Sequence, residues 1–143
     1  MYLVLLLSAS AAWAMIGLIW LIQVVHYPML ALYSEALPAV AASDHARRIT
    51  PVVGPLMAVE GLTALVLMVK QPDGVPWQLT WLAAALLGVA LVCTAAFSVP
   101  QHTRLAEGHD PIAAARLIQT NWYRTAAWSS RGVVLLIALA LAR

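Results

Sequence analysis

The sequence predicts an all-α membrane protein, a bundle of four transmembrane helices with short interfacial helices in the 1–2 and 3–4 connections. Hydrophobic residues make up 63% of the 143 residues and charged residues only 10%, whereas about a quarter of an average soluble domain is charged. Four long apolar runs follow one another along the chain. Because each crossing of a bilayer takes roughly 20 residues, four crossings and their connections fill a single domain, residues 1–143.

The charge and cysteine content exclude several classes of function. The formal net charge of +2 comes from Lys and Arg residues that are spread along the chain. Nucleic-acid grooves need a basic stripe interleaved with aromatic side chains, so we expect no nucleic acid as a partner. Cys93 is the only cysteine, which excludes an internal disulfide and a CxxC pair.

The first transmembrane helix is predicted over residues 2–26. It starts without the basic residues of a signal peptide and is too long for one, so we expect it to remain in the membrane. Pro28 fits its end because a proline ring cannot continue the helical hydrogen-bond ladder. The Ala-rich segment that follows predicts a short interfacial helix up to about Arg48.

The second and third helices are predicted over residues 52–69 and 77–99. Pro51 and Pro55 lie in or near the first turn of the second helix, where proline is tolerated. The third helix opens on two tryptophans, which are typical of the membrane interface. Pro100 then predicts a kink or a stop.

The fourth transmembrane helix is predicted over residues 121–142. Asp110 is the expected N-cap and Pro111 the first helical residue. An amphipathic helix from Pro111 can therefore run without a break into the membrane segment.

Polar side chains gather at one end of the predicted bundle, which we call side B, where helices one and three end and helices two and four begin. Residues three or four apart share a helix face, so we expect an inward-facing polar pocket in this leaflet. Its expected residues are Gln23 and His26 from the first helix, Ser98 and His102 from the third, and Asn121, Arg124, Trp128 and Arg131 from the fourth.

Glu60 and Arg131 are predicted to pair inside the bundle. Glu60 lies roughly 12 Å below the start of the second helix near Val52, and Arg131 lies at a similar depth below Arg124. An ionised side chain facing lipid costs several kcal/mol or more, so both should face the interior. The pair could fix the helix register or take part in function.

Three histidines belong to the expected pocket or its rim. His26 and His102 could act as acid and base near neutral pH, ligate haem or a metal ion, or be satisfied interface residues. His45 and Arg48 are three residues apart on the expected interfacial helix and could close over the pocket as a lid.

The arginines predict an orientation. Arg47, Arg48, Arg104, Arg116 and Arg124 lie towards side B, which by the positive-inside rule makes side B cytoplasmic. A bacterial inner membrane is the expected location.

Two short segments carry a family resemblance. VPQH at the end of the third helix and NWYRTAAW in the fourth, with a single acid in the second, resemble the anthrone-oxygenase-like small four-helix membrane proteins. The matching residues are Pro100, His102, Asn121 and Arg124. The resemblance implies an oxygen-dependent, cofactor-free oxidation of an aromatic polyketide, in which a base deprotonates an anthrone-type carbon.

The leading hypothesis is therefore a pocket that binds a small hydrophobic molecule and oxidises it without a cofactor. His26 or His102 would be the base, Arg124 and Arg131 would stabilise oxyanion charge, and Glu60 would hold Arg131. Substrate contacts would come from Gln23, His45, Arg48, Ser98, Asn121 and Trp128.

Two alternatives stay open. One is a redox protein in which His26 and His102 ligate haem or a metal ion. The other is a transport or proton-relay subunit, in which Glu60 and Arg131 line the path. In every case the lipid bilayer is a partner, and a homo-oligomer is a further hypothesis.

Overall fold

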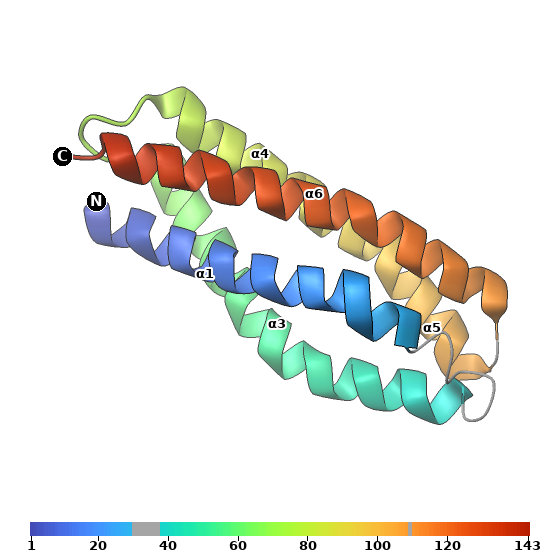
Figure 1. Cartoon of the computed structure of the whole chain (residues 1–143). Helices are drawn as coiled ribbons and strands as arrows, with labels where there is room; N and C mark the ends of the chain where they lie inside the picture. Colours follow the sequence, from blue (N-terminus) through green and yellow to red (C-terminus); the bar gives the residue numbers. More distant parts are fainter. Residues whose placement is uncertain (30–37, 109) are drawn as a thin grey trace.

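The computed structural model describes residues 1–29, 38–108 and 110–143 as a bundle of long helices (Figure 1). Both chain termini lie at one end of the bundle, and side B is the opposite end. The all-α four-helix prediction is confirmed. In chain order the elements are α1 (Tyr2–Leu21), η1 (Ile22–His26), α3 (Pro38–Val69), α4 (Trp77–Cys93), η2 (Thr94–Ser98), α5 (Val99–Glu107) and α6 (Pro111–Leu141).

The protein is an integral membrane protein. Four helical spans in the described residues are long and apolar enough to cross a bilayer, namely Tyr2–Met29, Ser43–Val69, Trp77–Glu107 and Pro111–Leu141. The bundle exterior carries large apolar side chains such as Leu62, Leu65 and Val69. Such a surface suits lipid chains rather than water.

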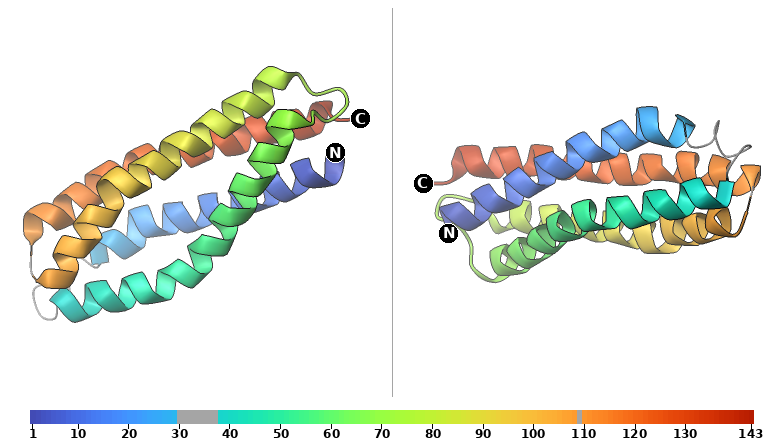
Figure 2. Two further views of the ribbon diagram at one scale, coloured as in Figure 1. Left: turned by 180° about the vertical axis from the view of Figure 1, so that it is seen from behind. Right: turned by 90° about the horizontal axis from the view of Figure 1, so that it is seen from below.

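The second span differs from its prediction. Instead of an interfacial helix up to Arg48 and a separate membrane helix from residue 52, α3 is one continuous helix that contains Pro51 and Pro55. Each proline removes one backbone hydrogen bond and kinks a helix without ending it when both sides are well packed. Figure 2 shows the resulting change of direction about halfway along α3.

The third span also continues beyond its predicted end. The helix passes through Pro100 and ends at Glu107, with the π-helical turn η2 just before the proline. A π-helical turn inserts one extra residue and rotates the side chains that follow it. The first span has a similar turn, η1, just before Tyr27.

The fourth span agrees with its prediction. Asp110 caps α6 by accepting a hydrogen bond from the backbone N–H of Ala113 at 2.9 Å, and Pro111 is the first helical residue. The helix then runs unbroken to Leu141. It is the central element of the site because it packs against both α1 and α4.

Small residues bring the helices close together. Ala9 and Ala12 on α1 and Ala83 on α4 are buried in the core, and short side chains allow membrane helices to approach closely. At Gly132 on α6 a Cβ atom would collide with Ile16 of α1. These contacts hold α1 and α4 against α6 and so set the positions of their polar residues.

Candidate functional site

Three histidines and a tyrosine meet at side B, and we call them the histidine cluster: His26, Tyr27, His45 and His102. His26 Nε2 lies 2.7 Å from His45 Nδ1, and the Tyr27 hydroxyl lies 3.1 Å from His102 Nε2. The rings of His45 and His102 stack with centroids 5.3 Å apart. The cluster therefore joins the end of the first span to α3 and α5.

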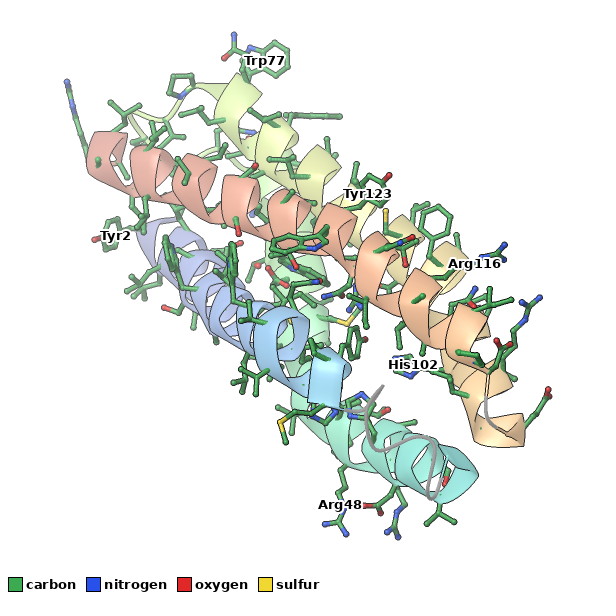
Figure 3. All side chains as sticks on the ribbon, turned by 45° about the vertical axis from the view of Figure 1, so that its right-hand side comes forward. Tyr2, Arg48, Trp77, His102, Arg116 and Tyr123 are labelled. Carbon is green, nitrogen blue, oxygen red and sulfur yellow. The ribbon has the colours of Figure 1, made fainter. Side chains whose placement is uncertain are left out.

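Figure 3 shows the direction of His102, which points from α5 towards the interior of the bundle. Sequence reasoning expected His26 and His102 in one pocket, and the structure brings both to the cluster. His45, expected as part of a lid, lies between them. Its position comes from the continuous α3, which carries His45 up to the histidines of the other spans.

Sequence reasoning missed Tyr27. A tyrosine at the end of a membrane helix is typical of an interfacial anchor, but Tyr27 is only 3% exposed and its hydroxyl contacts His102. Neighbouring residues on a helix point about 100° apart. The inward direction expected for His26 therefore does not predict that Tyr27 is buried as well. The π-helical turn η1 ends at His26, and Tyr27 follows it directly.

A second group of polar side chains, the arginine network, consists of Gln23, Ser98, Asn121 and Arg124. Arg124 Nη1 donates to Asn121 Oδ1 and to Ser98 Oγ, both at 3.0 Å. Asn121 Nδ2 donates to Gln23 Oε1 at 2.7 Å, and Gln23 Nε2 donates to the backbone oxygen of Ile118 at 3.3 Å. All four network residues are buried, as the sequence predicted.

The arginine network adjoins the histidine cluster. Arg124 lies close enough to the Tyr27 hydroxyl and to the His102 ring for its charge to act on both. Its guanidinium also lies over the ring of Trp128, 5.4 Å from the centroid. The two groups form one polar region around Arg124.

Glu60, Trp128 and Arg131 form a separate network. Glu60 Oε1 accepts from Arg131 Nε at 3.2 Å, and Oε2 accepts from Trp128 Nε1 at 2.9 Å. The other Arg131 nitrogens donate to the Ala83 backbone oxygen at 2.6 Å and to Ser8 Oγ at 3.0 Å. The predicted pairing of Glu60 with Arg131 is confirmed.

The catalytic roles expected for Glu60 and Arg131 do not agree with this geometry. Glu60 follows His45 by fifteen residues along α3, which corresponds to roughly 20 Å of helix. Both side chains are sealed by protein partners, with 0% and 1% exposure. The structure thus places them away from the histidine cluster, and neither of them lines the groove described below.

Two of the expected substrate contacts also fall outside the site. Arg48 does not close over a pocket, because its side chain is 73% exposed and pairs with Asp44 on the outer face of α3, and Figure 3 shows it pointing away from the bundle. Trp128 is fully buried. It contacts Arg124 and Glu60 and is not part of the wall of the groove described below.

An apolar groove opens between α3 and α5 beside the histidine cluster. Its volume is about 480 Å³, within the range of small-molecule sites. His102 is the one histidine in its wall. The lining residues are Ser43, Ala46, Ile49, Thr50, Val99, His102, Thr103 and Ala106.

The contacts of the histidines bear on the expected haem or metal ligation. His26 Nε2 faces His45 and His102 Nε2 faces Tyr27, so ligation of iron by these two nitrogens would require both contacts to break. Within the described residues, no three His, Cys, Asp or Glu side chains are arranged to hold a metal ion.

Comparisons with known proteins identify no relatives. No protein-family model, curated protein or solved structure matches the chain significantly.

Proposed function

We propose that this protein binds a small hydrophobic molecule in the groove between α3 and α5 and removes a proton from it with His102. The observation that carries the proposal is that His102 belongs both to the groove wall and to the histidine cluster. An apolar cavity with a few convergent polar groups is the usual form of a small-molecule site.

His102 is well placed to act as the base. When its Nε2–H donates to the Tyr27 oxygen, the lone pair on Nδ1 is free to accept a proton. Nδ1 is buried and has no hydrogen-bond partner among the described residues. No described residue occupies this lone pair, and a small shift of the ring towards the groove would present it to a substrate carbon acid.

His26 is the weaker of the two candidates for the base. It does not line the groove, and its Nε2 lies 2.7 Å from His45. We assign His26 and His45 to positioning, since His45 stacks on His102 and limits the rotation of its ring.

Arg124 supplies the positive charge that such a reaction needs. Removal of a proton from a carbon that is conjugated with a carbonyl, as the CH₂ of anthrone is through its aromatic rings, places negative charge on oxygen, and a fixed cation in a water-poor site stabilises that charge. Arg124 lies next to His102 and is held by Ser98 and Asn121.

The reaction that we propose is an oxygen-dependent oxidation of an anthrone-type CH₂ group, in keeping with the resemblance of the VPQH and NWYRTAAW segments. His102 takes one proton, and the carbanion gives electrons to O₂ with formation of a C–O bond. Loss of water from the resulting hydroperoxide leaves a carbonyl. One O₂ is thereby reduced by four electrons as CH₂ becomes C=O, and one molecule of water is released.

The test is oxygen uptake by the protein in lipid nanodiscs with anthrone as substrate, together with the absorbance of the anthraquinone product. We expect uptake above that of empty nanodiscs, with one O₂ consumed per anthraquinone formed. Uptake equal to that of empty nanodiscs would overturn the oxidation.

We also propose that side B faces the cytoplasm of a bacterial inner membrane. The support is the concentration of exposed arginines there, including Arg47, Arg104 and Arg116. A cysteine introduced at Arg104 should be labelled by a membrane-impermeant maleimide only after the cells are opened. Labelling in intact cells would reverse the orientation.

A further inference from the structure

Arg124 carries a buried positive charge for which the described residues supply no counter-charge. Three charged side chains are buried in the described bundle: Glu60, Arg124 and Arg131. Glu60 and Arg131 neutralise each other. The polar neighbours of Arg124 are neutral groups: Ser98 and Asn121 accept from its Nη1, and the Tyr27 hydroxyl lies beside it.

The Arg124 guanidinium also has an unused donor. Its Nε is buried and has no hydrogen-bond partner among the described residues, and the side chain as a whole is only 9% exposed. A buried charge without a partner destabilises a fold strongly. A buried donor that lacks an acceptor also destabilises it, by a smaller amount. An anion bound beside Arg124 would remove both costs.

The apolar groove lies on the other side of His102 and Tyr27 from Arg124. His102 lines the groove, and its Nε2 lies 3.1 Å from the Tyr27 hydroxyl, which neighbours Arg124. Arg124 itself does not line the groove, so a ligand whose body fills the groove would extend its polar head past these two side chains to meet the guanidinium. The groove wall is formed mainly by alanine, valine and isoleucine side chains and the carbon atoms of hydroxyl residues.

We infer that the ligand of this protein is an anionic amphiphile, with an apolar body in the groove and a negatively charged oxygen head at Arg124. The inference rests on the groove of the proposed function and adds the charge of its ligand. Carboxylates, phosphates and ionised enols or phenols share this chemistry. The source can be a free small molecule or an anionic phospholipid of the bilayer.

The test compares two probes with the same apolar body, 1-pyrenecarboxylate and the uncharged 1-pyrenemethanol. Binding to the protein in phosphatidylcholine nanodiscs is measured by energy transfer from tryptophan to pyrene, and empty nanodiscs correct for partitioning into lipid. We expect the carboxylate to bind at least tenfold more tightly than the alcohol.

Two variants and a control locate the charge. R124Q removes the cation, and N121D places a carboxylate where Asn121 Oδ1 now accepts from Arg124 Nη1. Both should abolish the preference for the carboxylate probe. The control R116Q, on the outer face of α6 (Figure 3), should retain it. N121D keeps the test decisive if R124Q does not fold.

The outcomes separate this inference from the proposed function. Equal affinity for the two probes, or a preference that survives in R124Q and N121D, would overturn the anionic head while leaving the groove as a binding site. Absence of binding of either probe would overturn both. A repeat of the measurement in nanodiscs that contain the anionic lipid phosphatidylglycerol distinguishes the two sources of the ligand. If the natural ligand is an anionic phospholipid, phosphatidylglycerol will displace the pyrenecarboxylate; if it is a free small molecule, the pyrenecarboxylate will stay bound.

Discussion

Glu60 on α3 and Arg131 on α6 form an ion pair that is closed off from solvent, with Arg131 Nε 3.2 Å from Glu60 Oε1. Trp128, Ser8 and the Ala83 backbone complete their hydrogen bonds. The pair thus ties together α1, α3, α4 and α6. Its contacts fix how the helices pack, and the chemistry that we propose lies at side B.

We predict that Glu60→Gln destabilises the bundle strongly. The substitution leaves Arg131 as a buried charge without a partner, and breaking one side of a buried ion pair costs about 3–5 kcal/mol. The midpoint of thermal unfolding in detergent, followed by circular dichroism, should fall by many degrees. Asp44→Asn, which removes an exposed ion pair, is the control and should leave the midpoint nearly unchanged. An equal effect of the two substitutions would contradict the structural role.

We predict that His102→Gln lowers the rate of anthrone oxidation by about 10²–10⁴, the usual contribution of a general base. The helix content and unfolding midpoint should change little, because His102 is only half-buried. Arg104→Gln, at an exposed position of the same helix outside the groove wall, is the control and should retain the rate. A His102→Gln protein as active as wild type would remove His102 from the mechanism.

Two residues on one turn of α3 should behave differently. His45 stacks on His102, whereas Arg48 points outward and pairs with Asp44. We therefore expect His45→Ala to lower the oxidation rate and Arg48→Gln to leave it unchanged, with both rates measured as oxygen uptake. A loss of activity in Arg48→Gln would restore the lid that the sequence suggested.

The turn between α3 and α4 offers a test of the fold away from the site. Gly74 has a positive φ of 80°, and a Cβ there would lie 2.6 Å from the Leu141 backbone oxygen. Gly74→Ala should cost about 1–3 kcal/mol, seen as a lower unfolding midpoint. Gly88→Ala in α4, where a Cβ meets nothing within 4 Å, should be neutral or slightly stabilising. An unchanged unfolding midpoint in Gly74→Ala would contradict the positive φ of this residue and its close approach to the Leu141 backbone oxygen.

Much of the fold follows from the sequence because its main signals are strong and local. Apolar runs of membrane length predict the four spans, and Asp110 with Pro111 predicts the start of α6. Pro51 and Pro55 misled the prediction of α3, since a proline that opens a helix and one that bends it look the same in sequence. Whether the helix starts at the proline or bends there depends on how the neighbouring spans pack against it, and this packing cannot be read from the local sequence.

The site was predicted in part for a similar reason. The opposite charges of Glu60 and Arg131 and their similar depth in the membrane were enough to predict that they pair. The helical periodicity was enough to predict that His26 and His102 lie at the same end of the bundle. Periodicity also suggested that Arg124 and Arg131, two turns apart on one face of α6, act together. The structure separates them instead. They lie roughly 10 Å apart along the helix, so that Arg131 belongs to the sealed ion pair and Arg124 to the polar region at side B.

Removal of a proton by His102 from a molecule in the groove can be measured through the exchange of the CH₂ hydrogens of anthrone for deuterium in D₂O without oxygen, followed by mass spectrometry. This measures proton removal alone. We predict that the wild-type protein accelerates the exchange over empty nanodiscs and that His102→Gln does not. Exchange at the same rate in both proteins, or no acceleration by the wild type, would contradict the account.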